Sequence, residues 1–153
     1  MADSAWREKL SEWLSLYDGG RKFKGFSEPG ENRQLSIFHG LEDIKKYGAN
    51  SDYVLIHDAA RPMLSEGMIT HCLNAAAACD GVLPVLPMKD TVYRSVDGKK
   101  ITSLLKREEI FAGQAPEVFR LGKYYEANRC MLPDKIMGIN ASKEPDGKEG
   151  LDI

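Results

Sequence analysis

The sequence lacks the features that mark several large classes of protein. No apolar run approaches the roughly 20 residues that a membrane-spanning helix needs. The opening residues, MADSAWREKL, have neither the basic start nor the apolar stretch of a secretory signal peptide. No internal repeat or low-complexity tract is present. These absences predict a globular cytoplasmic protein with no membrane partner.

Cysteine and basic charge are also scarce. The three cysteines, Cys72, Cys79 and Cys130, are odd in number and have neither a CxxC pair nor a zinc-ligand spacing. We therefore expect small, partly buried thiols and no disulfide framework. The 21 basic and 23 acidic residues give a net charge of −2. This balance leaves no basic footprint, so we expect no nucleic-acid partner.

The length and composition fit one globular domain. A chain of 153 residues, 42% hydrophobic and 29% charged, is long enough to bury a core. Ser4 is a plausible N-cap for a first amphipathic helix. Its apolar residues recur at helical spacing, and we expect its two tryptophans to be core contacts. They are Trp6, Leu10, Trp13, Leu14 and Tyr17.

A glycine-rich, charged loop, KFKGFSEPGENRQ, precedes a second predicted helix. Its apolar residues, Leu35, Ile37, Leu41 and Ile44, predict a helix that ends near Gly48. The loop delivers Gly30, Arg33 and Ser36 to the helix start, where free backbone N–H groups can bind an anion. A capped surface turn would give the same pattern, and on this segment alone that structural interpretation is favoured.

A strand, a helix and a second strand follow. The strand YVLI is followed by a helix capped by Ser65 and by the apolar run GVLPVLPM. This order predicts a parallel βαβ unit and a layered α/β sheet with helices on both sides. The histidine within the helix, His71, is expected on a partly exposed or packing face, and a catalytic role is the less favoured interpretation.

Residues 90–107 alternate around an Asp97-Gly98 turn and predict a protruding β-hairpin arm. A lone hairpin cannot hide its apolar face, on which we place Val92 and Ile101, so we expect the arm to pack against another subunit. Beyond it we predict a short helical turn, a loop over residues 114–117 and a helix over residues 121–130.

Polar residues gather where the two predicted strands end. Asp58, Ala59 and Arg61 follow the first strand directly, and Lys89, Asp90 and Thr91 follow the second. Ligands of open α/β sheets bind at such ends, where a carboxylate can hold a metal or hydroxyl and an arginine can bind a phosphate. A local ion pair between Asp58 and Arg61 would give the same pattern.

Four strings in order, RQLSIFHGL, VLIHDAARP, DTVYRS and LLKREEIFAGQAPEVF, resemble the cytidylyltransferases that make 4-diphosphocytidyl-2-C-methylerythritol. They are equally similar to the relatives that activate ribitol 5-phosphate. The resemblance covers about residues 25–153, and HDAARP is its most specific element. It implies a Rossmann-like nucleotidyltransferase fold and a homodimer locked by exchanged arms. The implied reaction joins CTP to a sugar-alcohol phosphate with the help of Mg²⁺, and pyrophosphate leaves.

The resemblance also implies roles for individual residues. Gly30, Glu31, Ser36 and Ala59 would bind the nucleotide, and Thr91 would bind the sugar-alcohol phosphate. Asp58, Arg61 and Arg107 would be catalytic and would also contact this substrate, with Asp58 as the metal ligand. Arg107 would act in the partner's site. The chain differs from the family pattern in three residues, Tyr93, Ala115 and Glu117, where lysine, threonine and glutamine are usual.

Two family segments are missing from the sequence. No glycine-rich loop with an arginine and a lysine precedes Trp6, and the chain stops after GLDI without the second lysine segment. We therefore expect residues 1–153 to form an incomplete cytidylyltransferase domain with little activity alone. Three alternatives stay open at this point: a methylerythritol phosphate enzyme, a ribitol phosphate enzyme, and an inactive dimerising fragment.

Overall fold

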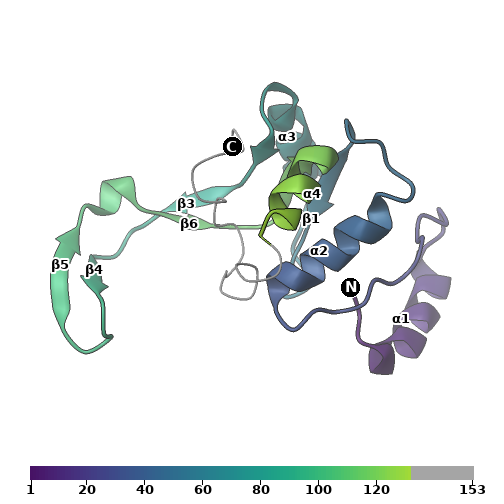
Figure 1. The fold of residues 1–153 in the computed structure, drawn as a ribbon, viewed down its shortest axis with the longest axis horizontal. Coiled ribbons are helices and arrows are strands. Elements are labelled where there is room, and N and C mark those ends of the chain that lie inside the picture. The colour runs from purple at the N-terminus through teal and green to yellow at the C-terminus, as the bar shows by residue number, and fades with distance from the viewer. Residues whose placement is uncertain (132–153) are drawn as a thin grey trace. The chain divides into compact units, whose positions relative to one another are not determined.

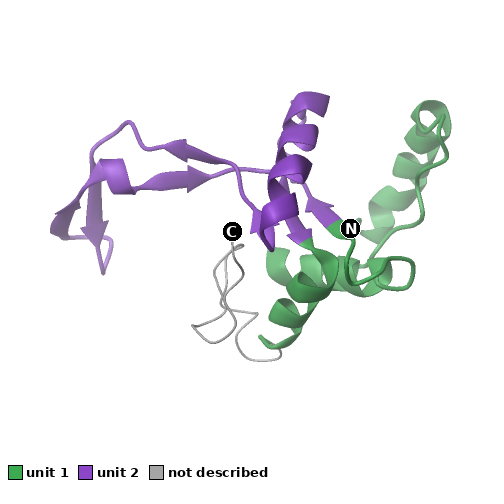
Figure 2. Ribbon diagram, turned by 90° about the horizontal axis from the view of Figure 1, so that it is seen from above, with its two compact units in different colours: residues 1–53, 120–151 green, residues 54–119, 152–153 purple. Residues whose placement is uncertain are grey.

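A computed structural model describes residues 1–131, which divide into two compact units (Figure 2). Unit 1 comprises residues 1–53 and the described residues from 120 onward, and unit 2 comprises residues 54–119. The prediction of a single domain over residues 1–153 extends into residues 132–153, which lie outside the described part of the chain, and it stays a prediction.

Unit 1 begins with helix α1, Ser4–Tyr17 (Figure 1). The residue that caps it is Asp3, whose carboxylate accepts a hydrogen bond from the Ala5 N–H, so the prediction of Ser4 as the cap was wrong by one position. Both tryptophans are largely exposed, Trp6 at 62% and Trp13 at 46%, and no residue of the helix is buried. The prediction that they are core contacts was also wrong.

Helices α2 and α4 supply the core of unit 1. Helix α2 spans Arg33–Ile44 and buries residues at i, i+3, i+4 and i+7, namely Gln34, Ile37, Phe38 and Leu41. It faces α4, Leu121–Arg129, which buries Leu121, Tyr124, Ala127 and Asn128. The two polar members hydrogen-bond to each other, with Gln34 Nε2 donating to Asn128 Oδ1 inside the core. The predicted end of α2 near Gly48 is a turn beyond the observed end, Ile44.

Unit 2 contains helix α3 and the strands, apart from the first residue of β1 and the last residue of β7. The described elements, in order, are β1 (Tyr53–Ile56), α3 (Glu66–Ala75), η1 (Ala76–Ala78), β2 (Gly81–Val82), β3 (Val85–Pro87), β4 (Val92–Ser95), β5 (Ile101–Leu105), η2 (Arg107–Glu109), β6 (Phe111–Gly113) and β7 (Glu117–Arg120). The strand order β1-β7-β2 forms one sheet, and β3-β6 and β4-β5 form two ribbons.

Strand β7 lies between β1 and β2. It was missed, because a loop was predicted over residues 114–117 and a helix from residue 121, with no strand between them. Strand β2 pairs with β7 antiparallel. Strand β1 also runs opposite to β7. The residue after β7, Leu121, donates to the carbonyl of Asp52, which precedes β1. At the other end, Gln114 precedes β7 and contacts Arg61, which follows β1. Strands β1 and β2 therefore run parallel, as predicted, but they are not neighbours.

The apolar run GVLPVLPM forms two short strands and not one. Strand β2 belongs to the three-stranded sheet, whereas β3 pairs with β6 in a separate ribbon with Val85 opposite Gly113. Pro84 and Pro87 cannot donate to a strand neighbour, which limits the length of each strand. Gly81 stands opposite Phe119 and leaves room for its ring, which a Cβ at this position would meet.

The core of unit 2 forms where α3 covers the three-stranded sheet. Its fully buried members are Cys72, Ala76 and Val118, and the half-buried Leu55 and Val82 pack against them. Burial raises the pKa of the Cys72 thiol, which keeps it in the neutral form. Helix α3 starts where the sequence predicted, because Ser65 Oγ accepts a hydrogen bond from the Met68 N–H at 3.2 Å.

The predicted hairpin is present as β4 and β5, at the end of the β3-β6 ribbon (Figure 1). The Asp97 carboxylate accepts hydrogen bonds from the backbone N–H groups of Lys100 and Lys99, both at 2.9 Å, and these bonds lower the pKa of Asp97. Gly98 has φ of 70°, which favours glycine at this turn.

The apolar surface of the arm differs from the prediction. The register sets Val92 opposite Leu105 and Tyr93 opposite Leu104, and a bulge beyond Arg94 sets Ile101 opposite Ser95. Because side chains alternate along a strand, Ile101 lies on the side of Tyr93 and Leu104, and Val92 lies on the other side. Placing Val92 and Ile101 on one face was therefore wrong. Tyr93, Ile101 and Leu104 are all exposed.

Among the residues that the structure describes, none of the helices combines the length and the apolar character that a membrane crossing requires.

The cap of α3 gives a first testable prediction. Replacing Ser65 by alanine removes the acceptor for the Met68 N–H, and we expect the free energy of unfolding to fall by about 1 kcal/mol. Ser65→Asp should keep most of the stabilisation, because aspartate also caps helices. Chemical denaturation followed by circular dichroism measures both. Equal stability of Ser65→Ala and the wild type would show that the cap contributes nothing.

Candidate active site

The segment after β1 forms a tight turn that brings Asp58 and Arg61 together. The Arg61 N–H donates to the Asp58 carbonyl at 2.9 Å, and Arg61 Nε lies 3.5 Å from Asp58 Oδ2. The ion pair that the structural alternative required is therefore present. Its side chains are 35% exposed for Asp58 and 47% for Arg61, so both can also reach a ligand from solvent. Ala59, between them in sequence, is exposed and leaves the backbone accessible.

Two residues that the sequence interpretation did not single out hold Arg61 in this turn. The His57 ring nitrogen Nε2 lies 2.7 Å from the Arg61 carbonyl oxygen, and Arg61 Nη1 donates to Gln114 Oε1 at 2.7 Å. A signal for His57 was available, because it is the first polar residue after a buried strand. Nothing comparable marks Gln114, since its contact spans 53 residues of sequence.

Thr91 and Arg107 meet at the base of the arm. Both line a cavity of about 320 Å³ with Leu104, Leu105, Lys106 and Glu108. Arg107 Nη1 donates to the Lys89 carbonyl at 3.2 Å, and Arg107 Nε lies 3.3 Å from Glu108 Oε1. The β3-β6 ribbon separates this base from β1 (Figure 1). Within the chain, Thr91 and Arg107 are thus brought together, and they are not brought to Asp58 and Arg61.

The remaining predicted residues, Gly30, Glu31 and Ser36, lie at the start of α2 in unit 1. The Gly30 N–H donates to Ser36 Oγ at 2.8 Å, and Ser36 Oγ donates to the Asn32 carbonyl at 2.9 Å. Asn32 Oδ1 caps the helix by accepting from the Leu35 N–H. The Ser36 hydroxyl therefore shapes the loop, while Glu31 is exposed beside it.

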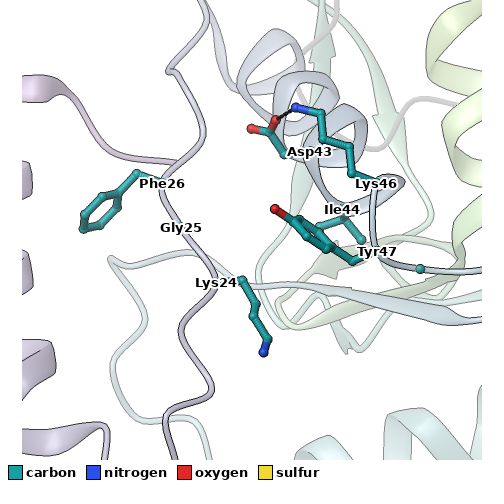
Figure 3. Close-up of a pocket in the computed structure, with 8 residues that line it drawn as sticks. Lys24, Gly25, Phe26, Asp43, Ile44, Lys46 and Tyr47 are labelled. Carbon is teal, nitrogen blue, oxygen red and sulfur yellow. Dashed lines mark hydrogen bonds and ion pairs between the residues drawn. The ribbon is translucent and has the colours of Figure 1, made fainter.

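Unit 1 also contains a cavity of about 430 Å³ that includes none of the predicted site residues (Figure 3). Its lining consists of Lys24, Gly25, Phe26, Asp43, Ile44, Lys46, Tyr47 and Gly48. Lys46 Nζ lies 2.6 Å from Asp43 Oδ1, and this contact, with a hydrogen bond from Ser27, lowers the pKa of Asp43. The acid of this cavity is therefore already paired with a lysine of the same helix end.

A metal site made by protein groups alone is not found in residues 1–131. No group of three or more histidine, cysteine, aspartate or glutamate side chains gathers there. Asp58 contributes one carboxylate at the end of β1. Because Mg²⁺ is commonly held by one or two carboxylates together with substrate phosphates, Asp58 fits a cation shared with a bound phosphate.

The loop before α2 gives a second testable prediction. A Cβ at Gly30 would lie 2.6 Å from Leu35 Cβ and 2.7 Å from the Leu35 backbone carbon. We expect Gly30→Ala to lower the free energy of unfolding by about 1–3 kcal/mol through overpacking. Gly19→Ala is the matched control, because no atom lies within 4 Å of its Cβ position. Thermal denaturation measures the stability of both variants. A Gly30→Ala variant as stable as the wild type would contradict the close packing.

Comparison with known proteins gives a consistent result. Residues 24–138 match the family described as 2-C-methyl-D-erythritol 4-phosphate cytidylyltransferase, IspD. The bifunctional enzyme IspD/IspF of Bartonella tribocorum is 38% identical over 92 residues, which are 60% of this chain and 22% of that protein. The 2-C-methyl-D-erythritol 4-phosphate cytidylyltransferase of Halalkalibacterium halodurans is 32% identical over 133 residues, 87% of this chain and 56% of that one.

Solved structures show the same likeness. The 4-diphosphocytidyl-2C-methyl-D-erythritol synthase of Anaerococcus prevotii superposes with a TM-score of 0.71 at 26% identity, over 84% of this chain and 54% of that one. The corresponding enzyme of Thermus thermophilus gives 0.58 at 26% identity, over 88% and 69%. These neighbours confirm the predicted α/β nucleotidyltransferase fold. The family match ends at residue 138, short of the predicted extent to Ile153.

The chain spans about half or less of the length of the curated relatives described above. The matched residues nevertheless cover most of the chain and include the turn after β1, the arm and the loop before α2. The chain therefore belongs to the 2-C-methyl-D-erythritol 4-phosphate cytidylyltransferase family.

Proposed function

We propose that the chain forms part of a cytidylyltransferase that converts CTP and 2-C-methyl-D-erythritol 4-phosphate into a diphosphocytidyl product for isoprenoid synthesis. A phosphate oxygen of the sugar alcohol attacks the α-phosphorus of CTP. The new phosphorus–oxygen bond forms as the bond to the β-phosphate breaks, and pyrophosphate leaves. The observation that carries this proposal is the half-exposed Asp58–Arg61 pair at the end of β1, inside the matched region.

Reactions at phosphorus depend mainly on positioning and on neutralising charge. In this proposal Arg61 binds a phosphate group with its guanidinium, and Asp58 lies beside it at the same turn. Thr91 and Arg107, which share the cavity at the arm base, bind the phosphate of the sugar alcohol. Catalysis rests on Asp58, Arg61 and Arg107.

The nucleotide is assigned to Gly30, Glu31, Ser36 and Ala59. The hydrogen bond from Gly30 N–H to Ser36 Oγ supports a shaped loop whose backbone can approach a base or ribose. The exposed Ala59 leaves its main chain open in the same way. Ser36 then acts by fixing the loop, because its hydroxyl is already bonded to Gly30 and Asn32.

The metal in this proposal is Mg²⁺, with Asp58 as its protein ligand and phosphate oxygens completing the site. When bound, the cation neutralises negative charge on the phosphates. Arg61 provides the second positive charge at the same turn, since its Nε lies 3.5 Å from Asp58 Oδ2.

We also infer a cytoplasmic homodimer joined by the arm. The exposed Tyr93, Ile101 and Leu104 lie on one side of a two-stranded hairpin, which cannot cover them itself. Their burial by a second copy would bring Arg107 toward the partner's site. This arrangement agrees with the β3-β6 ribbon, which separates the base of the arm from β1 (Figure 1).

A chimeric enzyme tests the function. In it, the region of the Halalkalibacterium halodurans relative that matches this chain is replaced by the chain itself. We expect pyrophosphate release from CTP with 2-C-methyl-D-erythritol 4-phosphate and Mg²⁺, and little release with ribitol 5-phosphate. Higher activity with ribitol 5-phosphate would reassign the substrate. A folded chimera that binds neither substrate would favour the noncatalytic dimerising module.

Replacing Asp58 by asparagine gives the third prediction. In the chimera we expect turnover to fall by about a hundredfold or more, because a charge at the phosphate site is lost. The free energy of unfolding should change by less than about 1 kcal/mol, since an exposed ion pair contributes little. Steady-state kinetics and denaturation are measured on the same preparation. Parallel losses of activity and stability would instead assign Asp58 a structural role.

Mixing two disabled subunits gives the fourth prediction. One chimera carries Arg107→Ala and the other carries Asp58→Asn, and each homodimer is inactive. If the arm crosses to the partner, one site of each heterodimer contains both wild-type residues, so random exchange restores about a quarter of all sites. Activity is measured after mass spectrometry has confirmed exchange. A mixture no more active than its parents would contradict a site shared between subunits. A chain that stays monomeric would contradict the homodimer.

A further inference from the structure

We propose that His57 and Gln114 are positioning residues that hold Arg61 in the orientation in which it binds a phosphate group. The proposal rests on the proposed function, and it adds two residues to the machinery assigned above. Neither residue is placed in contact with the substrate. Each acts through Arg61, one on its main chain and one on its side chain.

His57 fixes the main chain of Arg61. Its Nε2 lies 2.7 Å from the Arg61 carbonyl oxygen, and because a carbonyl only accepts, Nε2 carries the proton. The other ring nitrogen, Nδ1, is shielded from solvent and has no hydrogen-bond partner among the described residues. The Arg61 N–H donates to the Asp58 carbonyl, so both the N–H and the carbonyl of Arg61 are hydrogen-bonded.

Gln114 fixes the side chain of Arg61. Its Nε2 group donates to the carbonyl oxygens of Gly113 at 3.0 Å and Ala112 at 3.3 Å. These two acceptors orient the amide, so that Oε1 points to Arg61 Nη1 at 2.7 Å. The Gln114 N–H also donates to the Pro84 carbonyl at 2.8 Å, which anchors the residue beside the β3-β6 ribbon.

These contacts orient the guanidinium without using all of it. An arginine side chain carries five N–H donors in a planar fork, and Gln114 and Asp58 face only Nη1 and Nε. The side chain is still 47% exposed, so the rest of the fork can reach a phosphate. Ordering the side chain beforehand reduces the entropy that binding would otherwise lose, which strengthens a bidentate contact.

Stability alone is a poor explanation for this arrangement. An exposed ion pair such as Asp58–Arg61 contributes little to folding, so fixing its arginine side chain with Gln114 adds little stability through that pair. His57 also leaves its shielded Nδ1 without a partner, which costs free energy. A gain in phosphate binding accounts for both observations.

The test uses the ¹⁵N-labelled chain and two readouts. The first is the NMR signal of the Arg61 Nε–H group, assigned by its loss in Arg61→Lys. The second is the affinity for 2-C-methyl-D-erythritol 4-phosphate, measured by calorimetry. His57→Ala and Gln114→Met remove the two contacts. His57→Gln can still donate to the Arg61 carbonyl, and His71→Ala is the matched control because His71 is exposed on α3.

We expect both His57→Ala and Gln114→Met to broaden or shift the Arg61 signal. Gln114→Met should weaken the affinity about tenfold, as for a lost hydrogen bond to a charged group, and His57→Ala, which loses a bond to a neutral carbonyl, about fivefold. His57→Gln should restore most of both, and His71→Ala should change neither. An unmoved Arg61 signal with unchanged affinity in the folded variants overturns the proposal. Equal losses in His57→Ala and His57→Gln overturn the role of the Nε2 hydrogen bond.

The two readouts also separate this proposal from the proposed function. If the wild-type chain does not bind 2-C-methyl-D-erythritol 4-phosphate and the chimera releases no pyrophosphate with it, the proposed substrate fails, while the Arg61 signal still decides whether His57 and Gln114 hold the arginine. If His57→Ala does not fold, Gln114→Met decides on both readouts, because Gln114 lies in a half-buried loop outside the core.

Discussion

The burial of β7 is the constraint on which unit 2 depends. Its residues Glu117, Val118 and Phe119 are all buried, and its neighbours on the two sides are β1 and β2. Because β7 runs opposite to β1, the residues that precede β7 arrive where β1 ends. Gln114 thereby reaches Arg61 across 53 residues of sequence. The position of one buried strand thus assembles the turn that the sequence marks as HDAARP.

Local chemistry explains which parts of the fold the sequence could predict. Ser65 caps α3 through its own side chain, and the Asp97-Gly98 turn closes the arm through backbone groups two and three residues away. Contacts between residues two or three positions apart can be recognised from a short stretch of sequence. Strands β6 and β7 cannot, because three or four residues paired with distant partners are too few to show a period.

The candidate site divides in the same way. Asp58, Arg61 and Thr91 could be found because they follow apolar strands, and the loop at Gly30 because it precedes a helix start. Family resemblance added their roles and the role of Arg107. The grouping of Thr91 with Arg107 follows from the predicted hairpin over residues 90–107, whereas the contact of Arg61 with Gln114 spans 53 residues and could not be derived from the sequence. The two tryptophans of α1 show that a local pattern can also mislead. Their spacing is amphipathic, but the helix buries none of its residues.

The bulge in the arm has a consequence for solubility. A two-stranded ribbon has two open edges, and each offers unpaired backbone groups to which another chain could add and start an aggregate. The extra residue between Ile101 and Ser103 breaks the regular register and increases the local twist, which makes a flat continuation of the ribbon harder. Exposed charges at Arg94, Lys99 and Lys100 lie close by and repel a second identical edge. The same irregularity that sets Ile101 on the side of Tyr93 therefore also limits uncontrolled strand addition.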